Sequence, residues 1–369
     1  MTQAFAPDWF SAPGSTLTML MARERRSTAE LARCLNRDTS FVLRLISGTE
    51  PIEGATAQML SDNLGGTPAF WKTRQEKFEQ ALDRAASAVS ADTAKSWLRT
   101  LPMKELSDAG WLTITSKSNT LHAALTYFNV MSPEEWRGRY AEHATKFSYR
   151  TSETFQSKLG ALAAWLRQGE LQAAGVTCAK WNAEEFRKVL MKIRGLTRLK
   201  EPAMFVGQLR GLCAQAGVAV VFVKAPAGCR ASGATRFIRP DKAMIILSFR
   251  HLSDDHFWFS FYHEAAHLLL HGPSATFVDG EAAEETVKER EANAFAAGAL
   301  IPLEHQDRLF ALRATVNDVV RFAVTIGIAP GVVVGQLQHH GLIGPHQLNG
   351  LKRRYNWEQV LAAVTKLTP

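Results

Sequence analysis

Residues 254–272 read DDHFWFSFYHEAAHLLLHG, and this stretch decides the fold of the C-terminal half of the chain. Apolar side chains dominate it, which predicts a long buried helix over about 254–271. Ser253 suits the start of that helix, two aspartates suit its positive end, and Gly272 followed by proline suits its C-terminus. We therefore expect a core helix that carries several histidines.

Two of these histidines have the spacing of metal ligands. His263 and His267 lie one turn apart on one helix face, so both imidazoles can reach a single ion. Glu264 can reach a water molecule at that ion without binding the ion, as a general base does. His256 and His271 suit capping or supporting contacts, with substrate contact by His271 as an alternative. The competing interpretation is a pair of partly buried histidines that only satisfy local hydrogen bonds.

A third ligand is expected on the next helix, at about 281–300, because catalytic zinc takes three protein ligands and keeps one position open. This segment contains KEREANAFAAGALIP, residues 288–302. Glu289 and Asn293 share a face with small alanines that let two helices approach closely. Glu289 can then bind zinc while Asn293 orients one of the histidines. Glu291 is the rival ligand, and an ordinary acidic helix is the alternative for all three.

Three strands are predicted before the long helix, within VAVVFVKAP (218–226), ATRFI (234–238) and KAMIILSFR (242–250). Strands followed by two long helices indicate a small α+β domain. Residues 96–200 and the tail from 305 onward are expected to be helical. The fold class is therefore α+β and mostly helical.

The N-terminal segment is expected to form a series of short helices over residues 16–90. Ser27 and Glu30 have capping-box spacing at the start of TAELARCLN. A turn at 36–38 then leads into TSFVLRLISG, which Gly48 closes. Two helices joined by a turn of about four residues are the core of a helix-turn-helix.

Composition places the 369-residue chain among ordinary globular proteins, with 46% hydrophobic and 21% charged residues. No stretch approaches the ~20 consecutive apolar residues of a membrane helix, and the N-terminus lacks the pattern of a secretory signal. Four widely spaced cysteines suit reduced thiols, so a cytoplasmic location is expected. The net charge of +8 does not by itself indicate DNA binding, because residues 1–95 hold 11 basic and 11 acidic side chains.

The motif HEAAHLLLHG (263–272), followed by EREANAFAAGALIP (289–302), resembles the ImmA/IrrE family of metallo-endopeptidases. The family pattern is His-Glu-x-x-His and, on a later helix, a Glu four residues before Asn or Asp. The resemblance implies that zinc is bound by His263, His267 and Glu289, with Glu264 as the base.

The resemblance also covers SGATRFIRPDKAMIILSFR, residues 232–250. It implies that the last strand of this segment, 242–250, is the edge strand of the active site, where substrate can add as an extended strand. No residue is assigned to stabilise the oxyanion.

A second resemblance joins STAELARCLNRDTSFVLRLISGTEPI (27–52) to AQMLSDNLGGTPAFWKTRQEKFEQAL (57–82). Together they are similar to XRE-type helix-turn-helix domains of the HigA antitoxin kind. In that geometry the second helix enters the major groove near its start. The positions expected to read bases or hold phosphates are then Arg37, Thr39, Ser40 and Arg44. A helical domain that docks proteins is the alternative.

Four parts are therefore expected along the chain. They are an XRE/HigA-like DNA-binding domain (1–92), a helical linker or regulatory domain (93–200), a zincin-like metallopeptidase core (201–305) and a helical subdomain (306–369). The predicted function is regulatory proteolysis of a helix-turn-helix repressor or antitoxin, either a separate protein or this chain's own N-terminal domain. Double-stranded DNA is an expected partner and no membrane is, and a homodimer would match two DNA half-sites. The alternative is a repressor or antitoxin without proteolytic activity, whose zinc domain senses or scaffolds.

Overall fold

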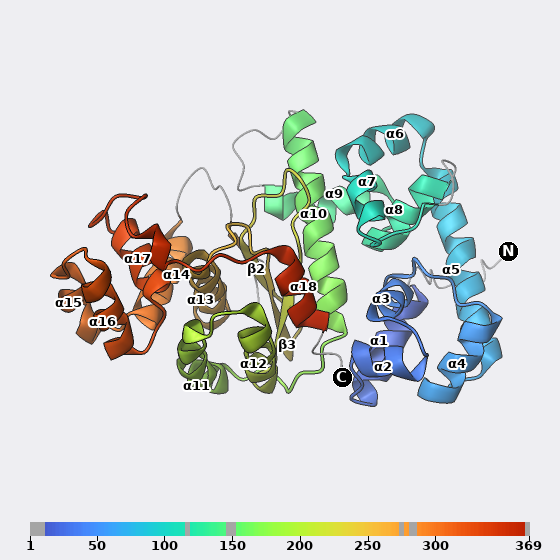
Figure 1. Cartoon of the computed structure of the whole chain (residues 1–369). Coiled ribbons are helices and arrows are strands. Elements are labelled where there is room, and N and C mark those ends of the chain that lie inside the picture. Colours follow the sequence, from blue (N-terminus) through green and yellow to red (C-terminus); the bar gives the residue numbers. More distant parts are fainter. Residues whose placement is uncertain (1–11, 115–118, 145–152, 273–276, 280–285, 366–369) are drawn as a thin grey trace. The chain divides into compact units, whose positions relative to one another are not determined.

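The computed structural model describes residues 12–114, 119–144, 153–272, 277–279 and 286–365. The chain divides into two compact units: unit 1 is Met1–Thr177 with Pro226–Cys229, and unit 2 is Cys178–Ala225 with Arg230–Pro369 (Figure 1). Helices dominate, and one small sheet lies in unit 2, in agreement with the predicted α+β class. The four-part division expected from the sequence stays a prediction.

Unit 1 contains only helices among its described residues. They are α1 (Pro13–Arg23), α2 (Thr28–Cys34), α3 (Thr39–Ser47), α4 (Gly54–Leu64), α5 (Pro68–Ala88), α6 (Ala91–Thr100), α7 (Met103–Asp108), α8 (Thr120–Phe128), α9 (Pro133–Ala144) and α10 (Glu153–Ala174). Helices α2 and α3 begin at the predicted residues and end within two residues of the predicted C-termini. The assignment of α2 and α3 as a DNA-binding helix-turn-helix stays a prediction.

Local capping explains where these N-terminal helices begin and end. The backbone N–H of Ser27 donates to Glu30 Oε2 at 2.6 Å, and the backbone N–H of Glu30 donates to Ser27 Oγ at 3.2 Å, so the predicted capping box is confirmed. Gly48 ends α3 with a φ of +82°, a left-handed conformation that favours glycine. Gly65 has a φ of +85° at the end of α4, and its carbonyl accepts a hydrogen bond from the buried indole of Trp71 at 3.1 Å.

Unit 2 holds the sheet and the helices that cover it. Its elements are α11 (Ala183–Arg194), η2 (Gly195–Arg198), α12 (Pro202–Gln215), β1 (Val218–Phe222), β2 (Gly233–Arg239), β3 (Lys242–Leu247), α13 (Asp254–Leu270), β4 (Phe277–Asp279), α14 (Val287–Leu300), η3 (Leu303–His305), α15 (Gln306–Phe310), α16 (Val316–Ile326), α17 (Pro330–His339), η4 (Asn349–Leu351) and α18 (Trp357–Thr365). Helix α12 packs against β1 and α18, whereas α13 packs against β2, β3, α14 and α17.

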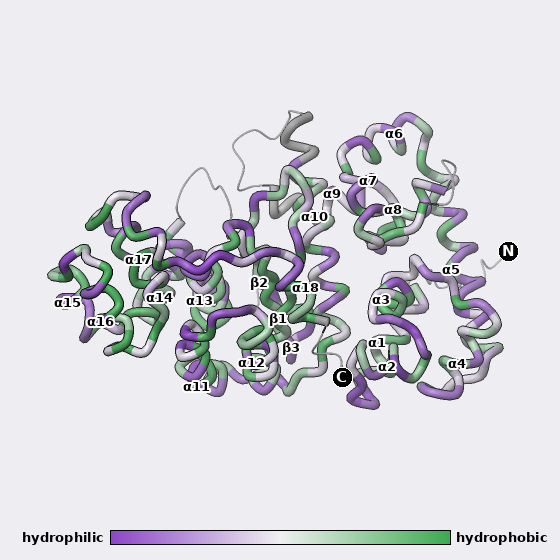
Figure 2. The backbone as a smooth tube through the Cα atoms, in the orientation of Figure 1, coloured by the Kyte–Doolittle hydropathy of each residue, from purple (hydrophilic) through white to green (hydrophobic). Residues whose placement is uncertain are grey.

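Strand β3 is a central strand, so the expectation that residues 242–250 form the edge strand of the active site is wrong. The order in the sheet is β1-β3-β2-β4, with β1 parallel to β3 and the other pairs antiparallel. Every residue of β3 is buried, and Figure 2 shows β1 and β3 as apolar runs. Such continuous burial is typical of a strand inside a sheet.

Strand β4 lies along the outer side of β2, at residues where no strand is predicted. Its pairs with β2 are Gly233 with Asp279, Ala234 with Val278 and Thr235 with Phe277. Three residues are too few to show the alternation that identifies a strand in a sequence. The sheet therefore has four strands where three are predicted, and the additional strand β4 forms the edge next to β2.

No single described helix is long and apolar enough to cross a membrane. Helices α16 and α17 pass a test of length and composition only as a pair, bent by 110°. Their apolar side chains, including Val319, Phe322 and Val333, belong to the hydrophobic core of unit 2.

Candidate metal centre

Three side chains from two helices converge on one point. His263 Nε2 and His267 Nε2, on α13, lie 3.1 Å apart. Glu289 Oε2, on α14, lies 3.1 Å from the first and 3.5 Å from the second. Among the described residues, these three form the group of histidines, cysteines and carboxylates that could hold a metal ion.

The separations of these atoms fit a tetrahedral metal. Bonds of about 2.0–2.1 Å at the tetrahedral angle place ligand atoms roughly 3.3–3.4 Å apart, close to the 3.1–3.5 Å found here. Two imidazoles and one carboxylate are the ligand set of many catalytic zinc sites. The residues present therefore fit zinc.

Small side chains between α13 and α14, and an N-cap at the start of α14, place Glu289 beside the two histidines. Ala292 and Ala296 of α14 are fully buried, as are Ala265 and Ala266 of α13, which lets the two helices pack closely. The expected start of this helix near 281 is wrong for a local reason. The Thr286 hydroxyl accepts the backbone N–H of Glu289 at 3.2 Å, so the helix begins at Val287 and Glu289 lies in its first turn.

The ring nitrogens that face away from the cluster have partners of their own. His263 Nδ1 lies 2.9 Å from Asn293 Oδ1, so Asn293 contacts the first of the two histidines. Burial lowers the pKa of His267 to about 4, although Glu289 opposes the shift. The His267 imidazole is therefore neutral at pH 7 and has a lone pair to offer to a metal.

His271 and Glu291 lie beside the cluster rather than in it. His271 Nδ1 is 2.9 Å from His267 Nδ1, and His271 Nε2 is 2.9 Å from Glu291 Oε2. Glu291, the rival third ligand in the sequence analysis, thus contacts His271. His256, the other neighbouring histidine, stacks on His251 near the start of α13, with ring centroids 4.1 Å apart.

Glu264 is fully buried on the side of α13 that meets β2. A Cβ atom added to Gly233, the first residue of β2, would lie only 2.6 Å from Glu264 Cγ and 2.7 Å from Oε1. The missing side chain of Gly233 therefore makes room for the carboxylate. Sequence reasoning missed this contact, because a glycine directly before a predicted strand is normally interpreted as part of a turn.

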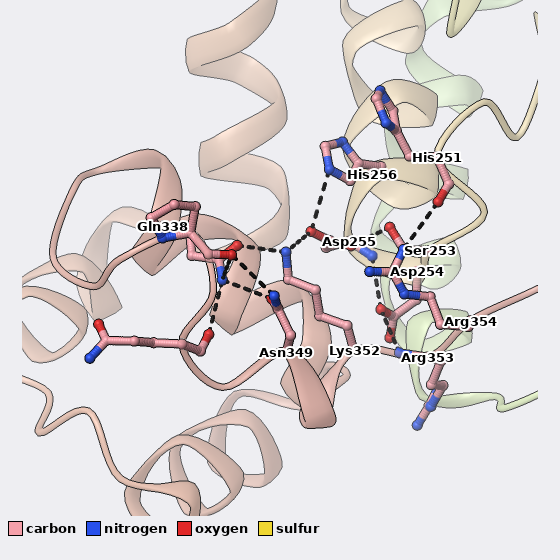
Figure 3. A network of polar contacts seen from close by, with 12 residues as sticks. His251, Ser253, Asp254, Asp255, His256, Gln338, Asn349, Lys352, Arg353 and Arg354 are labelled. Atoms are coloured by element: carbon pink, nitrogen blue, oxygen red, sulfur yellow. Dashed lines mark hydrogen bonds and ion pairs between the residues drawn. The ribbon is translucent and has the colours of Figure 1, made fainter.

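Polar contacts from the C-terminal segment fix the start of α13 (Figure 3). The Lys352 ammonium lies 2.6 Å from Asp255 Oδ2, and both side chains are buried. Ser253 occupies the N-cap position, as predicted, but its hydroxyl donates to Asp255 Oδ1 at 2.7 Å and does not cap the helix. Burial raises the pKa of Asp255, but hydrogen bonds from Lys352 and Ser253 outweigh burial and leave the pKa below its ordinary value.

Asp254, at the start of the same helix, makes the stability of the protein depend on pH. Its side chain is fully buried, and burial together with the nearby charge of Asp255 raises its pKa from 3.8 to about 6, although the backbone N–H of Arg353 donates to it and opposes the shift. The folded protein therefore holds this proton up to about pH 6, whereas the unfolded chain loses it near pH 4. Stability must then fall as the pH rises through this window, by about 3 kcal/mol in total.

The Asp254→Asn variant removes this titration but keeps an oxygen that can accept the backbone N–H of Arg353. The free energy of unfolding of wild type relative to the variant should fall by about 2 kcal/mol between about pH 4.5 and 7.5. Denaturant unfolding at both pH values measures it. Equal differences at the two pH values would show that Asp254 does not titrate as described.

The four residues predicted to contact DNA lie at the start of α3 or along it. Arg37 and Ser40 are exposed, and Thr39 is partly exposed. The guanidinium groups of Arg37 and Arg44 lie over the Phe41 ring, 5.5 and 5.9 Å from its centroid. Arg44 also pairs with Glu50 at 2.9 Å, so an acidic group already neutralises its charge.

Comparison with known families matches residues 213–333 to the IrrE N-terminal-like domain, Peptidase_M78. The matched segment runs from the end of α12 into α17 and contains all three residues of the metal cluster. No curated protein and no solved structure gives a significant match. The family match therefore supports an ImmA/IrrE-type protease domain within unit 2, and with it peptidase activity in general.

Proposed function

We propose that the protein is a zinc-dependent endopeptidase that cleaves a helix-turn-helix repressor or antitoxin. The observation that carries the proposal is the convergence of His263 Nε2, His267 Nε2 and Glu289 Oε2 at 3.1–3.5 Å, with the buried carboxylate of Glu264 on the same helix. A purely structural zinc site is normally closed by four protein ligands. Three ligands beside an acid that is not part of the cluster suit catalysis instead.

In this proposal the residues of the candidate site have separate roles. His263, His267 and Glu289 would hold the zinc, which when bound polarises the scissile carbonyl and makes water more acidic. Glu264 takes a proton from the attacking water as the new C–O bond forms, and later gives it to the amine nitrogen as the C–N bond breaks. Asn293 keeps the His263 ring in place through its contact with Nδ1.

A substrate in extended form would bind along the outer side of β2. That side begins at Gly233, which lies against Glu264, so a peptide paired there passes close to the base. Strand β4 holds this position in the structure, with Asp279 opposite Gly233. Binding of a substrate strand at this edge would therefore take the place of β4.

We also propose that the protein binds DNA through α2 and α3, which are joined by a turn of four residues. Arg37 and Ser40 are the strongest candidates for contact, because both are exposed beside the start of α3. To contact DNA, Arg44 would have to break its ion pair with Glu50 and bind a phosphate group instead. The Asp38 carboxylate accepts the backbone N–H of Phe41 at 2.7 Å, so its role is to cap α3.

The proposal is tested by incubating the full-length protein with purified helix-turn-helix regulators and with its own isolated residues 1–92. The protein is first stripped with a chelator and then supplied with zinc or left metal-free. We expect cleavage at a defined site of one of these substrates with zinc, and intact substrate without it. Cleavage that persists in the metal-free protein would contradict the proposal, as would zinc binding without cleavage of any regulator.

The Gly233→Ala variant is expected to lose peptide hydrolysis but keep zinc. The added methyl group displaces Glu264, and misplacing a reacting group by about 1 Å can cost roughly 100-fold in rate. The atoms nearest to the added Cβ all belong to Glu264 and none to the three candidate ligands, so zinc affinity should be unchanged. The matched control is Gly211→Ala on α12, where a Cβ meets open space. Full activity of Gly233→Ala would show that the close contact does not matter.

A further inference from the structure

His271 is the third histidine along one face of α13. The rings of His263 and His267 have centroids 4.7 Å apart, and those of His267 and His271 are 5.0 Å apart, as expected for residues spaced by four on a helix. The first two histidines direct Nε2 toward Glu289. Both nitrogens of His271 lie against other groups, so its task differs from that of the two candidate ligands.

The contacts of His271 indicate which nitrogen carries the proton in the rings of His267 and His271. His267 Nε2 faces His263 Nε2 and Glu289 Oε2, and a histidine that offers Nε2 to a metal carries its proton on Nδ1. His271 Nδ1 lies 2.9 Å from this Nδ1–H and can accept its hydrogen bond. The proton of His271 is then on Nε2, which donates to Glu291 Oε2, also at 2.9 Å. The contact between His267 and His271 and the contact between His271 and Glu291 thus each have one donor and one acceptor, and the Glu291 carboxylate is the final acceptor.

We propose that His271 and Glu291 are positioning residues that hold His267 in the tautomer and ring orientation that metal binding requires. The inference rests on the proposed zinc site, and it concerns the support of that site. Ligating histidines commonly donate their second N–H to such a partner, which fixes the ring and increases its basicity. Here His263 uses the amide of Asn293, whereas His267 uses a histidine backed by a carboxylate.

The two residues proposed to support His267 differ in how deeply they are buried. The His271 side chain is only 4% exposed, whereas that of Glu291 is 54% exposed. His271 follows the last residue of α13 and precedes Gly272, whose φ of +68° ends the helix. The contacts therefore connect the buried His267 to a carboxylate at the surface, and Glu291 can be changed without opening the hydrophobic core.

The test is the zinc affinity of the full-length protein, measured by competition with a chromogenic chelator. His271→Leu removes the acceptor for His267 and should weaken zinc binding by about 10–100-fold. His271→Asn offers an amide oxygen near the position of Nδ1 and should recover part of this loss. Glu291→Ala should weaken binding less than His271→Leu. His256→Leu, on the same helix but outside these contacts, is the control and should bind like the wild type.

Thermal unfolding of the metal-free proteins separates positioning from a general structural role. We expect His271→Leu and Glu291→Ala to leave the metal-free midpoint nearly unchanged while zinc affinity falls. A lower midpoint with unchanged zinc affinity would overturn the inference, as would wild-type affinity in both variants. If His271→Leu does not fold, Glu291→Ala decides, because its side chain is exposed. Failure of the wild type to bind zinc would instead overturn the proposed function itself.

Discussion

Replacing Lys352 with methionine is expected to lower the free energy of unfolding of unit 2 by about 3–5 kcal/mol. The Lys352 ammonium lies 2.6 Å from Asp255 Oδ2 and also 2.6 Å from Gln338 Oε1 (Figure 3). The side chains of the ion pair are only 8% and 6% exposed. Methionine keeps much of the packing but leaves the Asp255 carboxylate buried without its cation, and a buried charge without a partner is strongly destabilising.

Two further variants separate this cause from a loss of packing. In Lys352→Met combined with Asp255→Asn both charges are gone, so the double variant should be more stable than Lys352→Met alone. Arg321→Met removes an exposed cation that lies 3.8 Å from Asp318, and should change stability by less than about 1 kcal/mol. Denaturant unfolding measures all three. A double variant less stable than the single one would show that the buried charge is not the cause.

The Glu264→Gln variant is expected to lose peptide hydrolysis by about 10²–10⁴-fold, the usual contribution of a general acid or base. Glutamine has nearly the same shape, so it can fill the buried space beside Gly233, but it cannot take a proton from water. Glu264 is outside the cluster of His263, His267 and Glu289, so zinc affinity should not change. Initial rates of cleavage and the zinc content of the same preparation provide the two measurements.

A matched control for this variant is Glu304→Gln, an exposed glutamate in η3 of the same unit. It makes the same chemical change at a distance from the cluster and should hydrolyse peptide like the wild type. Wild-type rates in Glu264→Gln would exclude Glu264 as the base. Loss of zinc in that variant would show that Glu264 is a ligand, contrary to the arrangement described.

Many of the helices, both in the N-terminal segment and around the candidate site, could be predicted from the sequence because their signals are local. The spacing of apolar residues along one helix face, and the caps at Ser27 and Gly48, depend on neighbours within one or two helical turns. The i, i+4 spacing of His263 and His267 likewise fixes their common face. Placing Glu289 with them needed a resemblance to known proteases as well, because the spacing within the second helix left Glu291 as an alternative.

What could not be predicted depends on contacts between distant parts of the chain. The central place of β3 follows from its parallel pairing with β1, and no local pattern specifies strand order. The contact of Gly233 with Glu264 joins a strand to a helix 31 residues later. The pairing of Lys352 with Asp255 joins residues almost 100 positions apart. Sequence periodicity carries no information about such pairs.

The central claim is that His263, His267 and Glu289 together hold one catalytic zinc ion. It is tested most directly by an anomalous difference map at the zinc absorption edge, from crystals of the full-length protein grown with zinc. We expect one peak bonded to His263 Nε2, His267 Nε2 and a Glu289 oxygen at about 2.0–2.2 Å. The absence of a peak at this cluster, or a peak bonded to Glu264 in place of Glu289, would contradict it.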